Sequence, residues 1–264
     1  MIKRFINDIK KYSKYIRYST KSQLKSEITG SYLSWLWLII EPICFMLIYT
    51  FISMIVFKSK QEYFPVFVFI GLTMWSFFQK TIVSSIRLVV NNRDTVTKVY
   101  IPKFILLIVQ MGVNTVKFFI SFSLVIIFMI FYKVPISWNV LYLIPLFIAL
   151  FVFTFGLSTI FLHFGVFIQD LANITAIVLR LCFYMSGIFY NIETSLKSLY
   201  PYNKLLVKCV PLTAFITECR HILLYRMPLD LLLIFFWICV AFILAYIGLR
   251  IVYKYENTYV KVMK

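Results

Sequence analysis

The chain has 264 residues and a formal net charge of +17, with 62% apolar residues and only 14% charged residues. An ordinary soluble domain has roughly 45–50% apolar and about 25% charged residues. The composition therefore excludes a soluble globular domain, and the high hydrophobicity excludes a disordered chain. It also argues against a nucleic-acid-binding protein, because the basic residues lie between long apolar runs rather than on one polar face. The class that remains is a polytopic membrane protein.

Residues 1–33 are predicted to form an amphipathic helix that lies in the membrane interface. The segment carries eight Lys and Arg residues. Its regularly spaced apolar residues, at steps of four, three and four, are Phe5, Ile9, Tyr12 and Ile16. That spacing places them on one face of a helix. A basic amphipathic helix is typical of the membrane surface, and the alternative is a solvated basic tail.

Six apolar segments follow, each long enough to cross a bilayer. A helix needs about 20 apolar residues to span roughly 30 Å of hydrocarbon. We therefore predict an all-α membrane protein that forms one transmembrane domain over residues 1–264. The predicted spans are 34–57, 64–86, 104–132, 139–163, 171–190 and 229–252.

The segment 191–228 is fairly apolar but has no stretch long enough to cross a membrane. Pro201, Pro211 and Pro228 divide it into short pieces of helical length. We expect it to be a re-entrant helical hairpin between the last two spans, with its broken backbone buried by protein or facing water. Cys209 and Cys219 both lie in this segment, and they would pair only in an oxidising compartment.

The distribution of Lys and Arg predicts the orientation in the membrane. With the N-terminus inside, the inner connections carry 16 of these residues and the outer connections carry 8. We therefore expect both termini to be cytoplasmic, the segment 87–103 to be a cytoplasmic loop, and the hairpin to be extracytoplasmic.

The sequence predicts no catalytic site and no metal site in this chain. None of its seven glycines precedes another by five positions, so the P-loop pattern G-x-x-x-x-G-K is absent. His163 and His221 lie in different segments, without Cys or carboxylates at ligand spacing. No grouping of Ser, His and an acid suggests a nucleophile.

Two segments in the first half of the chain carry the clearest local motifs. Residues 30–42 read G-S-Y-L-S-W-L-W-L-I-I-E-P, and residues 91–103 read N-N-R-D-T-V-T-K-V-Y-I-P-K. Together with Gln169-Asp170-Leu171 and the segment 186–190, they resemble the membrane subunit of polysaccharide, O-antigen or teichoic-acid ABC exporters. The resemblance covers nearly the whole chain. The departures from the usual family residues are Ser34 for Gly, Gln169 for Arg and Gly187 for Pro.

The resemblance implies a homodimeric permease completed by two copies of an ABC ATP-binding subunit. ATP and magnesium would bind to that partner, and this chain would hold no cofactor. The implied substrate is a polyprenyl-linked glycan such as O-antigen, capsule or a teichoic-acid-like polymer. The implied location is the bacterial cytoplasmic membrane, where the chain would contact lipids and no nucleic acid.

In the family, a short helix in the loop after the second span docks onto the ATPase subunit. The loop 87–103 has charges that suit a short helix, since Asp94 would lie near its positive end and Lys98 near its negative end. The alternative is a solvated connecting loop. The candidate coupling residues are Asn92, Arg93, Asp94, Thr97, Lys98, Tyr100 and Pro102.

Two charges, Glu41 in the first span and Arg180 in the fifth, lie where an ionisable residue costs roughly 2.5–3.5 kcal/mol. At 1.5 Å per residue, both lie roughly 10–14 Å from the inner end of their spans. We hypothesise that they pair, within one subunit or across the dimer, although each could instead face a wet cavity separately. The family lines its channel with these two spans. The candidate channel residues are Trp37, Glu41, Phe45, Tyr49, Arg180, Tyr184, Gly187 and Tyr190.

Three other functions stay open on the sequence alone. The first is a permease of the same fold for a drug or another small lipophile. The second is a membrane-embedded glycan-modifying enzyme, which would need acids or His, such as Glu41, Asp170 and His163, to converge. The third is a non-catalytic scaffold.

Overall fold

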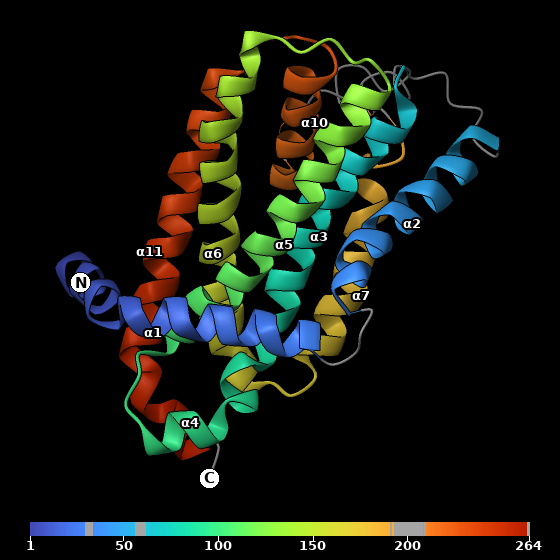
Figure 1. Cartoon of the computed structure of the whole chain (residues 1–264). Coiled ribbons are helices and arrows are strands. Elements are labelled where there is room, and N and C mark those ends of the chain that lie inside the picture. Colours follow the sequence, from blue (N-terminus) through green and yellow to red (C-terminus); the bar gives the residue numbers. More distant parts are fainter. Residues whose placement is uncertain (30–33, 56–61, 191, 193–207, 209, 263–264) are drawn as a thin grey trace.

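The computed structural model describes residues 1–29, 34–55, 62–190, 192, 208 and 210–262. They form a bundle of roughly upright helices, with α1 lying across it and α4 at one extremity (Figure 1). We call this extremity the α4 end and the opposite one the α10 end. The helices are α1 (Ile2–Thr29), α2 (Ser34–Ile55), α3 (Phe64–Asn91), α4 (Arg93–Lys98), α5 (Lys103–Phe131), η1 (Trp138–Tyr142, a 3₁₀ helix), α6 (Leu143–Phe167), α7 (Leu171–Met185), α10 (Pro211–Leu223) and α11 (Leu231–Val262).

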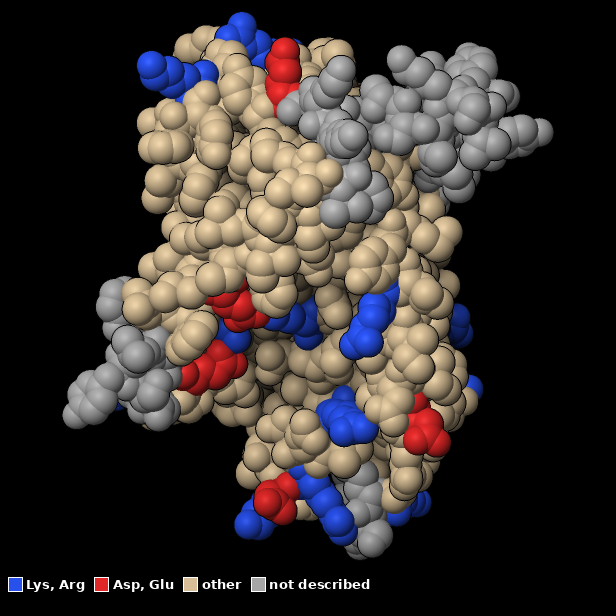
Figure 2. All heavy atoms as spheres, turned by 90° about the vertical axis from the view of Figure 1, so that its right-hand side faces the viewer, with Lys and Arg blue, Asp and Glu red and all other residues tan. Residues whose placement is uncertain are grey.

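Within the described part of the chain, five helices are long and apolar enough to span a membrane. They are α2, α3, α5, α6 with η1, and α11. The face formed by α2 and α7 carries a broad band without charged atoms, as a lipid-facing surface requires (Figure 2). The prediction of a multi-pass, all-α membrane protein is therefore confirmed.

The fifth predicted span, 171–190, differs from the helix observed. The helix α7 has only 15 residues and ends at Met185, whereas a perpendicular span needs about 20. The chain turns there because Gly187 adopts a φ of 68°, a left-handed conformation that glycine tolerates. Three other helices, α3, α6 and α11, run beyond their predicted ends, because Leu88, Val166 and Tyr259 are buried in apolar surroundings at the α4 end.

The helix α3 is the centre of the bundle. In the most apolar 18-residue stretch of α3, 72% of the residues are buried, compared with 17–39% in the corresponding stretches of the other candidate spans. The helix contacts α2, α5, α6, α7 and α10. The bundle is therefore arranged around α3.

The helices α6 and α11 form the most extensive helix pair. Glycines allow the close approach: a Cβ atom at Gly156 would lie 2.7 Å from the backbone nitrogen of Ala245. A Cβ atom at Gly248 would collide with Thr159. Small residues at such crossings let membrane helices pack backbone to backbone.

The predicted apolar face of the N-terminal helix is confirmed. Phe5, Ile9, Tyr12 and Ile16 all pack against a second apolar core at the α4 end, built from α3, α4, α5, α6 and α11. The helix α1 therefore lies against the bundle through the face that the sequence indicates. Its position in a membrane interface stays a prediction.

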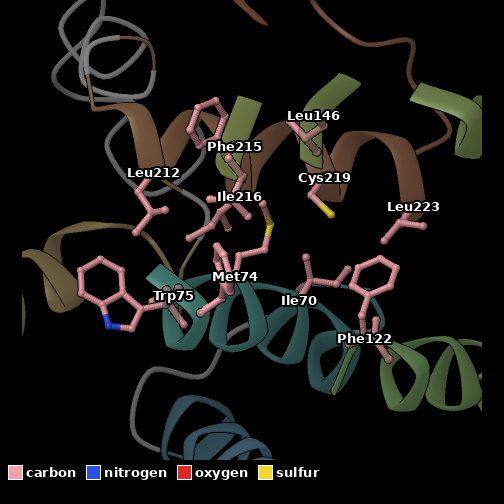
Figure 3. Packing of buried hydrophobic residues seen from close by; sticks show 14 of the residues in the cluster. Ile70, Met74, Trp75, Phe122, Leu146, Leu212, Phe215, Ile216, Cys219 and Leu223 are labelled. Atoms are coloured by element: carbon pink, nitrogen blue, oxygen red, sulfur yellow. The ribbon is translucent and has the colours of Figure 1, made fainter. Parts of the chain in front are cut away.

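Part of the predicted hairpin 191–228 is the helix α10. It begins at Pro211, ends before Pro228, and lays part of its apolar surface on α3, as Figure 3 shows for Leu212, Ile216 and Cys219. Cys219 is a fully buried free thiol, and Cys209 lies outside the described residues. The other arm of the predicted hairpin also lies outside them.

Arg220 of α10 is buried, and no carboxylate among the described residues pairs with it. Its Nη1 donates to the carbonyl of Gly187 at 2.8 Å and its Nη2 to that of Ile188 at 2.9 Å. Its Nε donates to the carbonyl of Phe67 at 3.1 Å, and the guanidinium lies 3.4 Å from the centre of the Phe67 ring. Arg220 thus ties α10 to α3 and to the turn after α7.

Candidate functional site

Four helices, α2, α3, α5 and α7, surround a cavity of about 760 Å3. Its volume is within the roughly 300–1,000 Å3 typical of ligand pockets. In Figure 2, acidic and basic side chains gather around a hollow midway along this face, below the charge-free band. The charged residues that line it are Glu41, Lys80, Lys117 and Arg180.

The charges of this cavity pair differently from the hypothesis. Lys80 Nζ donates to Glu41 Oε1 at 3.1 Å, so the partner of Glu41 is Lys80 and not Arg180 of the same chain. Lys117 pairs with Glu27 of α1. Arg180 has no hydrogen-bond or ion-pair partner among the described residues. Glu41 pairs with Lys80 because the central helix α3, which carries Lys80, lies directly beside α2.

Lys80 and Lys117 were not among the predicted site residues. Each is a single cation in an otherwise apolar span, and sequence alone permits such a side chain to extend to the membrane surface. The signal that could have found them is the one used for Glu41 and Arg180. Ionisable residues within spans are expensive and usually face the protein interior or a wet cavity.

Aromatic side chains form one wall of the cavity. Tyr49 lies 5.8 Å from Phe183 and 6.3 Å from Phe45, measured between ring centroids. Three of the predicted channel residues, Phe45, Tyr49 and Tyr184, line this cavity. Such rings offer flat apolar faces for contact with a ligand.

Three predicted channel residues lie elsewhere. Trp37 is 58% exposed on α2 and does not line the cavity. Gly187 and Tyr190 lie beside Arg220, next to a small void of about 10 Å3. Their place next to Arg220 indicates a structural role for this turn.

Amide and hydroxyl groups supply further hydrogen-bond donors. The side-chain oxygen of Gln79 accepts a bond from Trp75 Nε1 at 2.8 Å, which leaves the Gln79 amide nitrogen available. Asn114 donates to Thr81 at 3.0 Å. The other uncharged polar residues of the lining are Thr73, Ser76, Ser84, Gln110 and Ser121.

A second candidate surface is the helix α4, which the structure presents at the extremity of the molecule (Figure 1). Val96 is its buried anchor. Asn92 joins α3 to α4, since its side chain donates to the carbonyl of Leu88 at 2.8 Å and its own carbonyl accepts from Thr95 and Val96. The exposed predicted coupling residues are Arg93, Asp94, Thr97, Lys98 and Tyr100, while Pro102 is buried.

No family model matches the chain. Three curated relatives are similar to it, and each is named an O-antigen export system permease protein RfbA. The protein from Myxococcus xanthus is 26% identical over 191 residues, which cover 72% of this chain and 74% of the relative. Two proteins from Klebsiella pneumoniae are 27% identical over 172 residues, covering 65% and 66%, and 25% identical over 248 residues, covering 92% and 93%.

The chain resembles O-antigen export permeases. The resemblance inferred from the motifs at 30–42 and 91–103 is thereby confirmed. The similarity to these permeases and the five candidate spans agree on a multi-pass membrane protein.

The three residues considered for a membrane-embedded enzyme do not meet in the described part of the chain. Glu41 lines the cavity, but Asp170 and His163 do not. His163 instead bonds Tyr259 at 2.8 Å. Within the described ranges, no three His, Cys, Asp or Glu side chains converge as a metal site requires.

A polar network links the segment after α4 to the helices α1 and α11. Glu256 Oε1 of α11 accepts from Tyr100 Oη at 2.9 Å and from Arg4 Nη2 at 3.0 Å. Asp8 of α1 accepts from Tyr253 Oη at 2.7 Å. Burial and the hydrogen bond to Glu256 raise the pKa of Tyr100, so its hydroxyl stays a donor at neutral pH. The network joins α1, α11 and the segment that follows α4.

Replacing Glu256 by Gln should loosen this network. Hydrogen bonds to charged groups contribute about 1.5–3 kcal/mol to stability. Because Arg4 is half-exposed, water weakens its interaction with Glu256, and we expect the free energy of unfolding to fall by about 1–2 kcal/mol. The apparent melting temperature in mild detergent should then fall by roughly 2–8 °C. Asp94→Asn, on the exposed surface of α4, is the control and should change it little. Equal melting temperatures for both variants would contradict the assignment.

Proposed function

We propose that the chain is the channel-forming permease subunit of an ATP-driven exporter of a polyprenyl-linked polysaccharide. The observation that carries the proposal is the similarity to an O-antigen export permease over 92% of this chain. The polar, aromatic-lined cavity within an apolar bundle supports it. The exported polymer would be an O-antigen, a capsule or a teichoic-acid-like polysaccharide.

The proposed topology has six membrane crossings, with α7 as the short fifth, and α10 as part of a re-entrant outer hairpin. Both termini and α4 would face the cytoplasm of a bacterial cytoplasmic membrane. Two observations support this orientation. The inner connections carry most Lys and Arg residues, and α1, α4 and the C-terminal end of α11 all lie toward one end of the bundle (Figure 1).

In the proposed mechanism, two copies of this chain form a homodimer and two ATP-binding subunits complete the exporter. ATP and magnesium act in the partner subunits. Their closure would push on α4, and the network of Tyr100, Glu256 and Arg4 would pass the movement to α1 and α11. Since α1 also pairs with Lys117 at the cavity, the movement would reach the substrate path.

The partner can be tested by affinity purification from native membranes in mild detergent, followed by mass spectrometry. We expect a stoichiometric P-loop ATPase. Combined replacement of Arg93, Asp94 and Lys98 by Ala should reduce the recovered ATPase by at least about tenfold, because truncation of central interface residues costs more than 1 kcal/mol. Lys133→Gln, an exposed change at the α10 end, is the control.

The outcomes separate the proposal from its rivals. Recovery of the chain without any ATPase would contradict the exporter and favour the membrane-embedded enzyme. A deletion strain that loses its surface glycan and accumulates it inside supports polysaccharide export. A deletion strain with intact surface glycan and altered drug sensitivity would instead favour the permease for a small lipophile.

A further inference from the structure

The lining of the cavity has more positive than negative charge. Three of its residues are cationic, Lys80, Lys117 and Arg180, and one is acidic, Glu41. The ion pairs with Glu41 and Glu27 neutralise the two lysines. Arg180 then remains as the cation without a partner among the described residues.

An unpaired arginine in an apolar helix calls for a counter-ion. Its helix α7 carries no other charged residue, and Ile177, Val178 and Leu181 are exposed on its surface. Arginine within a span faces water, an ion or a ligand rather than lipid tails. Its planar group binds phosphate through two parallel hydrogen bonds, so an anionic ester is the chemistry that fits it.

We propose that this cavity binds the phosphate or diphosphate group of an isoprenoid or sugar ester, with Arg180 as the principal contact. Lys80, although paired with Glu41, and the amide of Gln79 line the same cavity and offer further N–H donors. The cavity volume of about 760 Å3 leaves room beyond the anionic group. The aromatic wall of Phe45, Tyr49, Phe183 and Tyr184 would take up the apolar or sugar portion.

The position of the cavity favours a lipid headgroup. Lys117 at its edge pairs with Glu27 of the amphipathic helix α1, and the hollow lies below the charge-free band of Figure 2. A basic amphipathic helix lies at the level of lipid headgroups. The choice of a lipid-linked phosphate as the ligand rests on the proposed function. The anion site itself is inferred from Arg180 and the other charged residues that line the cavity.

The test measures the binding of four probes to the purified protein in nanodiscs of zwitterionic lipid. The probes are farnesyl diphosphate, farnesyl monophosphate, farnesol and inorganic pyrophosphate. We expect both phosphorylated farnesyl probes to bind at least tenfold more tightly than farnesol. A preference for them over pyrophosphate identifies a lipid phosphate, and equal binding of pyrophosphate identifies a free diphosphate.

Three variants should differ in their effect on the affinity for farnesyl diphosphate. Arg180→Gln should weaken farnesyl diphosphate binding at least tenfold. Glu41→Gln should strengthen it several-fold, because it removes a negative charge and releases Lys80. Arg226→Gln, a cation outside the cavity lining, should leave binding unchanged. A merely structural role for Glu41 would not raise the affinity.

Two results would overturn the site: farnesol binding as tightly as farnesyl diphosphate, or affinities unaltered in both Arg180→Gln and Glu41→Gln. If Arg180→Gln elutes as an aggregate, the gain expected for Glu41→Gln decides alone. Recovery of the ATPase with Arg180→Gln separates the two proposals. If the ATPase is recovered but the substitutions leave farnesyl diphosphate binding unchanged, only the anion site is refuted. If farnesyl diphosphate binds as expected but no ATPase is recovered, only the exporter is refuted.

Discussion

Replacing Arg220 by Met should lower the apparent melting temperature of the purified protein by roughly 6–12 °C. The substitution keeps an unbranched side chain of similar length but removes every donor. The carbonyls of Gly187 and Ile188 then lose their bonds to this side chain. Each buried group left unsatisfied costs about 1–3 kcal/mol, and the contact with the Phe67 ring is weakened as well.

Two companion variants test the cause of this loss. Arg220→Lys keeps the charge but cannot reach three carbonyls at once, so its melting temperature should lie between those of the wild type and Arg220→Met. Arg226→Met changes an exposed arginine whose bond to Pro135 is long, at 3.4 Å, and should have little effect. Equal losses for Arg220→Met and Arg226→Met would show that the buried bonds contribute nothing.

Replacing Gly165 by Ala should also destabilise the protein, by about 2 kcal/mol. A Cβ atom at Gly165 of α6 would collide with the backbone of Ile86 in α3, including its carbonyl oxygen. Backbone atoms cannot rotate away, so the two helices must separate. Overpacking of this kind costs about 1–3 kcal/mol, occasionally more, and it exceeds the gain in helix propensity of about 1 kcal/mol.

Gly112→Ala is the matched control, because it makes the same change in the middle of a helix. The atoms nearest to its Cβ atom would be those of the Thr20 side chain, the closest at 3.1 Å. That side chain can turn aside, so we expect its melting temperature to stay within a few degrees of the wild type, against a fall of roughly 4–8 °C for Gly165→Ala. Similar losses for both would mean that the contact with Ile86 is not tight.

Much of the fold could be predicted from the sequence because it depends on local patterns. The apolar steps from Phe5 to Ile16 indicate one packed face of α1, and that face is buried as expected. The length of α7 could not be predicted in the same way. The apolar run continues past Met185, and the turn that ends the helix depends on Gly187 and on its bond to the distant Arg220.

The candidate site was predictable only in part. Glu41 and Arg180 both line one cavity, as charges within spans suggest. Their pairing could not be derived, because it depends on how each helix is rotated about its axis and on which helix is its neighbour. Because α3 lies at the centre of the bundle beside α2, Glu41 pairs with Lys80 of α3.

The Glu41–Lys80 pair also bears on how the chain enters the membrane. Of the five candidate spans, α3 is the least hydrophobic, with a mean hydropathy of 1.5 against 2.1–2.7 for the others. A lone lysine near the centre of a helix adds about 2.5–3.5 kcal/mol to its insertion. The helix α2 is synthesised first and brings Glu41 to that lysine. We therefore expect α3 to leave the translocon alongside α2, so that the first two helices partition into the bilayer as one unit.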